Sequence, residues 1–195
     1  MLLRKKSTAT HEAGHFVMRW YLGMSPTGCA VFSSVRTANG GPATGICYGS
    51  GEMMTADVQC FISAAGLASN FAITYKHNYF ALILTIADLL ADTRRYDDFA
   101  AKGHFDDLTQ LWLYSFRMKS EFARYMLLSF LVMKKHRDKV IQTRDSLMER
   151  GRITKREAAR IFAQWGKPPT WDIYHGLSKA AKDALATVAK GLDGE

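Results

Sequence analysis

The residues best suited to chemistry are His11, Glu12 and His15, which stand in the order His-Glu-Ala-Gly-His near the start of the chain. On a helix, residues four apart lie one turn apart on the same face, so both imidazoles can bind one metal ion. Zinc accepts neutral imidazole nitrogen, and catalytic zinc sites leave one of four positions to water. Glu12 can serve that water as general base and later protonate the leaving group. The pattern therefore predicts a zinc hydrolase in which His11 and His15 are ligands and Glu12 is the acid/base.

The motif needs a helix, and its surroundings predict one over residues 9–22. This stretch has no proline and only one interior glycine, and its apolar residues recur at helical spacing. The hydroxyls of residues 7–10 are suitable caps for its start. Gly14 carries a helix-propensity cost, which indicates close packing or a site at this position.

The motif helix is followed by a predicted hairpin, with strands at residues 29–35 and 44–48 and a turn at 38–42. An edge strand beside a metal can hold an extended substrate through backbone hydrogen bonds that do not depend on side-chain identity. Val31 and Ile46 are the candidate substrate-binding positions on this hypothesis. A hairpin that only covers the helix has the same pattern, so the sequence leaves both interpretations open.

The rest of the chain is predicted to be mostly helical, which makes the fold mainly α with a small β-hairpin (α+β). We expect helices at residues 55–77, 78–90 and from 108 onward, with a charged stretch at 92–107 that is loop-like or only partly helical. A long helical pattern covers 120–150 and ends at Gly151. Thr154 and Glu157 form a capping box that opens a short helix to about residue 165. The small residues 63–70 are expected to pack tightly against the motif helix.

Two prolines at positions 168 and 169 suggest a boundary after the short capped helix. We therefore expect one metallopeptidase domain over residues 1–166 and a Pro-linked tail over 167–195, with a weakly amphipathic helix near 177–189. This length and the 48% hydrophobic content are sufficient for a sizeable core.

Two histidines do not complete a catalytic zinc site, so a third ligand must come from elsewhere in the chain. The extended metzincin pattern would place a histidine at position 21, which is tyrosine, and that class is excluded. Glu52 is a candidate carboxylate, although it lies in a Gly-Ser-Gly turn before a helix.

Several stretches together resemble the protease domain of the FtsH family of membrane-anchored, ATP-driven zinc proteases. They are the Thr-His-Glu-Ala-Gly-His-Phe of residues 10–16, the glycine-broken hairpin, the Ala-Gly-Leu-Ala of 65–68, and the Gly-His-Phe-Asp-Asp-Leu of 103–108. The resemblance extends over about residues 7 to 165 and implies a third zinc ligand from an aspartate at the start of a helix. Asp107 matches that position, and Asp97, Asp98 and Asp106 are the alternatives.

The chain has no glycine-rich Lys-Ser/Thr phosphate loop, so the ATPase module of that family is not expected here. We expect a zinc-dependent metalloendopeptidase that cleaves flexible or unfolded polypeptides without ATP, or with a separate unfoldase or adaptor as partner. The rival hypothesis is an adaptor of the same fold whose basic helices bind an acidic partner or nucleic acid. Glu12 favours the enzyme, because a binding module has no chemical need for a general base.

The composition limits the classes of partner and the cellular compartment that we expect. The 26 Lys and Arg against 18 Asp and Glu give a net charge of +8, but no nucleic-acid recognition signature accompanies them, so nucleic acid is not the expected partner. Cys29, Cys47 and Cys60 fit neither a disulfide framework nor a zinc finger, which favours a reducing, cytoplasmic setting. No transmembrane segment is expected, because the apolar stretch 79–91 is short and contains Asp88. Residues 1–6 lack the apolar run of a signal peptide.

Overall fold

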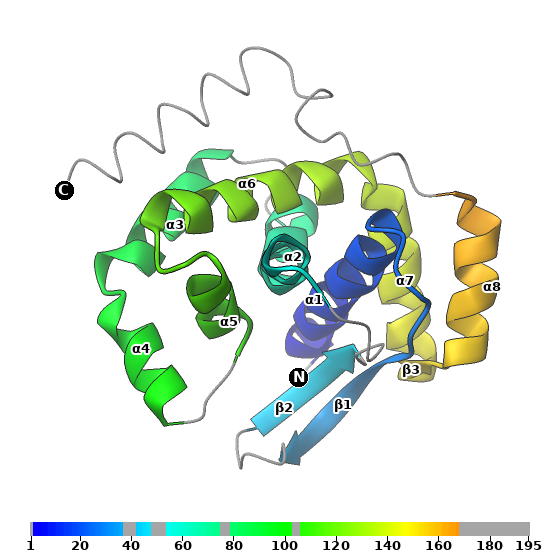
Figure 1. The fold of residues 1–195 in the computed structure, drawn as a ribbon. Helices are drawn as coiled ribbons and strands as arrows, with labels where there is room; N and C mark the ends of the chain where they lie inside the picture. The colour runs from blue at the N-terminus through cyan, green and yellow to red at the C-terminus, as the bar shows by residue number, and fades with distance from the viewer. Residues whose placement is uncertain (1, 37–41, 48–53, 75–78, 103–105, 168–195) are drawn as a thin grey trace.

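The structure, a computed structural model, describes residues 2–36, 42–47, 54–74, 79–102 and 106–167. Within these residues the protein is mainly helical with one small antiparallel sheet, as the sequence predicts (Figure 1). The predicted tail beyond residue 167 lies outside the described part. The elements in chain order are α1 (Leu2–Tyr21), β1 (Cys29–Arg36), β2 (Pro42–Cys47), α2 (Ala56–Thr74), α3 (Tyr79–Ala91), α4 (Arg94–Ala101), α5 (Asp107–Tyr114), α6 (Lys119–Lys135), α7 (Arg137–Arg150), β3 (Arg152–Ile153) and α8 (Lys155–Trp165).

The motif helix α1 is longer than predicted, since it begins at Leu2 rather than near Ala9. The hydroxyls expected to cap it lie inside the helix instead. Thr10 Oγ1 donates to the carbonyl of Lys6 at 2.9 Å, a bond to the preceding turn that a helical threonine can make. Nothing in residues 2–8 breaks a helix, so the backbone ladder continues through them.

The sheet has the order β2-β1-β3, with both pairings antiparallel. The predicted hairpin is confirmed as β1 and β2, while the turn residues 37–41 lie outside the described part. The two-residue strand β3 was not predicted, because so short a segment carries no alternating pattern. It places β1 in the middle of the sheet, and Val31 N donates to Gly151 O at 2.8 Å.

Helix α2 lies at the centre of the molecule, beside α1, α5 and α6 (Figure 1). Its small residues face α1, as the sequence predicts. A Cβ on Gly14 would stand 2.4 Å from Ala65 O and 2.6 Å from Ser69 Oγ. Two backbones can approach this closely only where side chains are absent. The propensity cost of Gly14 therefore has a packing cause.

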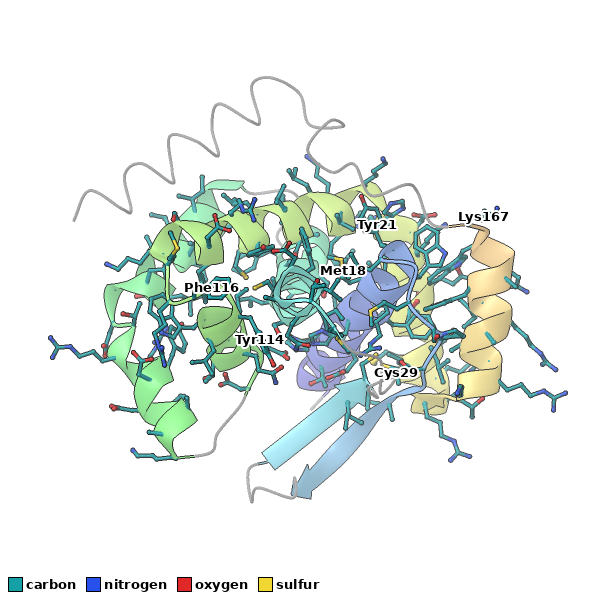
Figure 2. The ribbon with its side chains drawn as sticks, viewed as in Figure 1. Met18, Tyr21, Cys29, Tyr114, Phe116 and Lys167 are labelled. Carbon is teal, nitrogen blue, oxygen red and sulfur yellow. The ribbon has the colours of Figure 1, made fainter. Side chains whose placement is uncertain are left out.

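By length and composition, residues 56–73 of α2 could cross a membrane, and 61% of this stretch is buried inside the fold. Buried side chains from α1, among them Met18 and Tyr21, belong to the same core (Figure 2). A helix that packs in a protein core passes the same test of length and composition.

The charged stretch at residues 92–107, predicted to be loop-like or only partly helical, is partly helical, because α4 occupies the middle of it. Charged residues hide the pattern, since α4 buries a single aromatic side chain, Tyr96, at 2% exposure. The Tyr96 hydroxyl donates to Leu89 O at 3.1 Å and so joins α4 to the end of α3.

The long helical pattern at residues 120–150 is divided into α6 and α7 by His136, at φ −108° and ψ 32°. No glycine or proline marks this break, which explains why the sequence did not show it. The rings of Trp20 and Tyr21 lie against His136, at centroid distances of 5.3 and 5.6 Å. Helix α7 ends at Gly151 in the left-handed region, and the predicted capping box of Thr154 and Glu157 opens α8.

Candidate metal centre

His11 and His15 lie one turn apart on α1, and their Nε2 atoms are 3.1 Å from each other. Their rings meet edge to face, with an interplanar angle of 75°. The motif helix therefore directs both nitrogens to the same point, as the spacing predicts.

Asp107, the first residue of α5, brings a carboxylate to this point from a distant part of the chain. Its Oδ2 lies 2.8 Å from His11 Nε2 and 3.1 Å from His15 Nε2. The neighbouring Asp106 is the N-cap of α5 and accepts from Thr109 N at 2.7 Å. The cap fixes the first turn of α5 and with it the position of Asp107.

The other candidate aspartates do not join the histidines. Asp97 accepts from Arg117 Nε at 2.8 Å on the surface, and Asp98 is exposed on α4. Glu52 lies outside the described residues. Among the residues described, His11, His15 and Asp107 are the group whose ligand atoms, all within 4.8 Å of one another, could hold a metal ion.

The contact that Nδ1 of His15 makes determines which of the two ring nitrogens is free to bind a metal. Nδ1 of His15 lies 2.8 Å from the carbonyl of Ile62, which can only accept, so Nδ1 carries the proton in the neutral ring. Nε2 then presents a lone pair toward Asp107 and His11. A metal-binding histidine is commonly oriented by such a bond at its other nitrogen.

The cluster of ligand atoms attracts positive charge. Burial by itself would lower the pKa of His15, but Asp107 raises it to about 10. Burial would likewise raise the pKa of Asp107, yet the field of His15 and the hydrogen bonds from both histidines hold it well below its usual range. Two acceptor atoms held this close need a cation between them, which a proton or a metal ion can supply.

The donor set also fits zinc by size and kind. Two imidazole nitrogens and one carboxylate oxygen are ordinary zinc ligands, and tetrahedral bonds of 2.0–2.1 Å would separate them by roughly 3.3 Å. The three observed separations between His11, His15 and Asp107, from 2.8 to 3.1 Å, lie slightly below that value. A small outward movement of the side chains is enough to accommodate the ion.

Glu12 lies beside this cluster in a cavity of about 680 Å³ that His11, His15 and Asp107 also line. The Glu12 side chain is 6% exposed, and burial raises its pKa, although the two histidines oppose the shift. A raised pKa suits a carboxyl group that must both accept and return a proton.

Two glycines leave space for the site's side chains. A Cβ on Gly45 of β2 would stand 2.6 Å from Glu12 Oε1, and a Cβ on Gly66 of α2 would stand 2.4 Å from His11 Nε2. Neither glycine was predicted from the sequence to belong to the site. The run of small residues in α2 indicates close packing at Gly66, whereas no feature of the sequence indicates a role for Gly45.

The sheet places the two candidate substrate-binding residues differently. Val31 is 7% exposed on the central strand, where it pairs with Gly45 on one side and donates to Gly151 on the other. Its backbone is therefore not available to a substrate. Ile46 is 42% exposed, lines the cavity and belongs to β2, which pairs only with β1 among the described strands. Substrate pairing at Ile46 stays a prediction.

Arg19 is a cavity residue that the sequence analysis missed. It follows His15 by four positions on α1, lines the same cavity and is only 4% exposed. The spacing of four, continued one turn beyond the second histidine, is the signal that would have found it.

Comparison with known proteins identifies no relative of this chain: no family model, curated protein or solved structure matches it. Any functional conclusion therefore rests on the residues and their geometry.

Proposed function

We propose that the protein is a zinc-dependent metalloendopeptidase that cleaves flexible or unfolded polypeptides. The convergence of His11 Nε2, His15 Nε2 and Asp107 Oδ2 on one point, beside the buried Glu12, is the observation that supports it. Bound there, zinc would polarise the scissile carbonyl and bring the pKa of a water molecule toward neutrality. Asp107 is the third ligand on this proposal.

Glu12 is the proton carrier in this proposal. Its carboxylate accepts a proton from the attacking water and delivers it to the departing amine nitrogen, so the side chain returns to its starting state. The outer edge of β2 near Ile46 holds the substrate in an extended conformation through backbone hydrogen bonds. Such binding selects extended segments, which is why we propose flexible chains as substrates.

The order of the motifs supports a further proposal, that the chain is an FtsH-like protease domain acting without its own ATPase. A histidine pair on α1, a hairpin, a helix rich in small residues and an aspartate opening a later helix follow one another along the chain. A cytoplasmic location and a separate unfoldase partner belong to this proposal.

Metal analysis combined with proteolysis tests the function. The purified protein should hold about one zinc per chain and digest casein, a chelator should stop digestion, and added zinc should restore it. Zinc binding without any hydrolysis of casein or unstructured peptides would instead favour the adaptor hypothesis. Absence of zinc binding would overturn the metal site itself.

A further inference from the structure

Arg19 is buried in the cavity, and two of its three guanidinium nitrogens have no hydrogen-bonding partner among the described residues. Nε and Nη1 are both inaccessible to solvent, and neither makes a hydrogen bond within the described part of the protein. Buried arginines are nearly always paired, because leaving a buried charge uncompensated costs several kcal/mol. The burial of Arg19 therefore lowers the stability of the folded state, which indicates that the side chain has a function.

Other arginines of the protein have partners. Arg124 pairs with Glu121, Arg144 with Asp145 and Arg150 with Glu157, each with a nitrogen to oxygen distance of 2.7 or 2.8 Å. No ion pair among the described residues involves Arg19. Among the described residues, Arg19 thus lacks the acidic partner that each of these three arginines has.

The acids that line the cavity are already engaged. Asp107 contacts both histidines, Asp106 caps α5, and Glu12 is the proposed base. The remaining polar side chains on the described wall include Gln59, Ser63 and Gln110, which carry no charge. The Cys47 thiol also lines the wall, and its pKa is lowered first by a hydrogen bond with Cys29 and further by the charges of His15 and Arg19. Arg19 is therefore the group suited to recognise an anion that enters the cavity.

Carboxylate is the ligand chemistry that fits. A guanidinium presents parallel N–H donors that match the two oxygens of a carboxylate, and the pair is strong where water is excluded. Arg19 lies about 6 Å along the helix axis from His15, because four residues rise 1.5 Å each. That spacing is on the order of one or two residues of an extended peptide, which rises about 3.3 Å per residue.

We propose that Arg19 binds a carboxylate of the substrate, one or two residues from the scissile bond, and so gives the protease a preference for peptides that carry a carboxylate at that place. This inference rests on the proposed function. The carboxylate is either an Asp or Glu side chain or the free C-terminus of the substrate. Both sources offer the same two oxygens to the guanidinium.

The first test compares substrates on the wild-type protein. Matched peptides carry Glu or Gln at each position flanking the scissile bond, and each is made with a free and with an amidated C-terminus. We expect kcat/KM to fall on the order of tenfold to a hundredfold when the recognised carboxylate becomes an amide. A fall at one Glu position identifies a side chain, and a fall on amidation identifies the chain end. Equal rates for all peptides would overturn the inference while leaving the peptidase function intact.

The second test uses variants. Arg19→Met keeps the length of the aliphatic stem, should retain zinc, and should abolish the difference between the Glu and Gln peptides. Arg156→Met, at an exposed position on α8, removes the same charge and should preserve that difference. If Arg19→Met retained the selectivity, Arg19 would not be the anchor. If it failed to fold, the wild-type substrate series alone would decide.

Binding separates this inference from the proposed function. Glu12→Gln should bind the fluorescent acidic peptide more tightly than its amide counterpart, as measured by anisotropy, and the Glu12→Gln/Arg19→Met double variant should bind both equally. If the wild-type protein hydrolyses none of the peptides, that binding result would uphold the carboxylate site and reject the peptidase. Equal binding of both peptides to Glu12→Gln would reject the carboxylate site.

Discussion

Asp107 is the residue that distant packing brings to the histidine pair, and it is the third zinc ligand in the proposed function. It lies 96 residues from His11 in the chain, and an aspartate in the first turn of a helix is ordinarily a solvated group. Here the adjacent Asp106 caps α5, so the carboxylate of Asp107 is directed at two imidazoles. Its position depends on both the cap and the packing of α5 against α2.

The first prediction concerns the general base. Glu12→Gln preserves the size of the side chain but removes its ability to accept a proton, so peptide hydrolysis should fall about a hundredfold or more. Zinc should remain at about one per chain, measured by elemental analysis. His11→Ala should instead lose the metal. Wild-type hydrolysis by the Gln variant would assign Glu12 another role.

The second prediction concerns the third ligand. Asp107→Ala should weaken zinc binding by at least about a hundredfold, because it removes a ligand and not just an outer contact. Asp97→Ala is the matched control, since that carboxylate pairs with Arg117 on the surface, away from the histidines. Zinc titration against a competing chelator measures all three proteins. Unchanged affinity in Asp107→Ala would show that a different group completes the site.

At the scale of elements, the site depends on how closely α1 and α2 approach. Gly14 faces the backbone of α2, whereas Gly66 faces the ring of His11. Gly14 therefore determines the distance between the two helices, and Gly66 determines the space for the His11 imidazole. The serine hydroxyl of residue 69, 2.7 Å from both Thr10 O and Gly66 O, connects the two helices at this contact.

The third prediction separates these roles with two equivalent substitutions. Gly66→Ala adds a methyl group that displaces the His11 imidazole, so zinc affinity should fall while the folded state keeps or gains up to about 1 kcal/mol from helix propensity. Gly14→Ala meets backbone that cannot move aside, so the free energy of unfolding should fall by about 1–3 kcal/mol. Urea denaturation and zinc titration measure both. The opposite pairing of effects would contradict this assignment.

At the scale of the whole molecule, the proposed function places hydrolysis in the cavity that His11, Glu12, His15 and Asp107 line. The sequence has no glycine-rich Lys-Ser/Thr phosphate loop. Stable substrates expose cleavable segments only through opening events that cost several kcal/mol. Substrate stability should therefore control the rate of cleavage.

The fourth prediction follows from this expected dependence of the cleavage rate on substrate stability. The purified protein should digest a destabilised variant of a small domain much faster than the stable parent, and adding ATP should change neither rate. Side-by-side digestion with and without ATP, followed by gel electrophoresis, is the measurement. Equal digestion of both substrates, or a requirement for ATP in the pure sample, would contradict a protease that acts alone.

The sequence by itself determined the features that depend on near neighbours. The histidine pair, the hairpin and the capping box of Thr154 and Glu157 all depend on residues a few positions apart, where helical and strand periodicities are readable. The small residues of α2 also indicated close packing before any coordinates. Local periodicity gave neither the bounds of α4, which buries a single aromatic side chain, nor the break at His136, which the rings of Trp20 and Tyr21 contact.

Only the tertiary structure decided which groups meet in space. Glu52, Asp97, Asp98, Asp106 and Asp107 have the same chemistry in the sequence, and the packing of α5 against α2 brings Asp107 to the histidines of α1. The burial of Arg19 and the central place of Val31 were decided in the same way. Contacts between distant segments depend on how whole helices and strands pack, and no periodicity within a single segment encodes that packing.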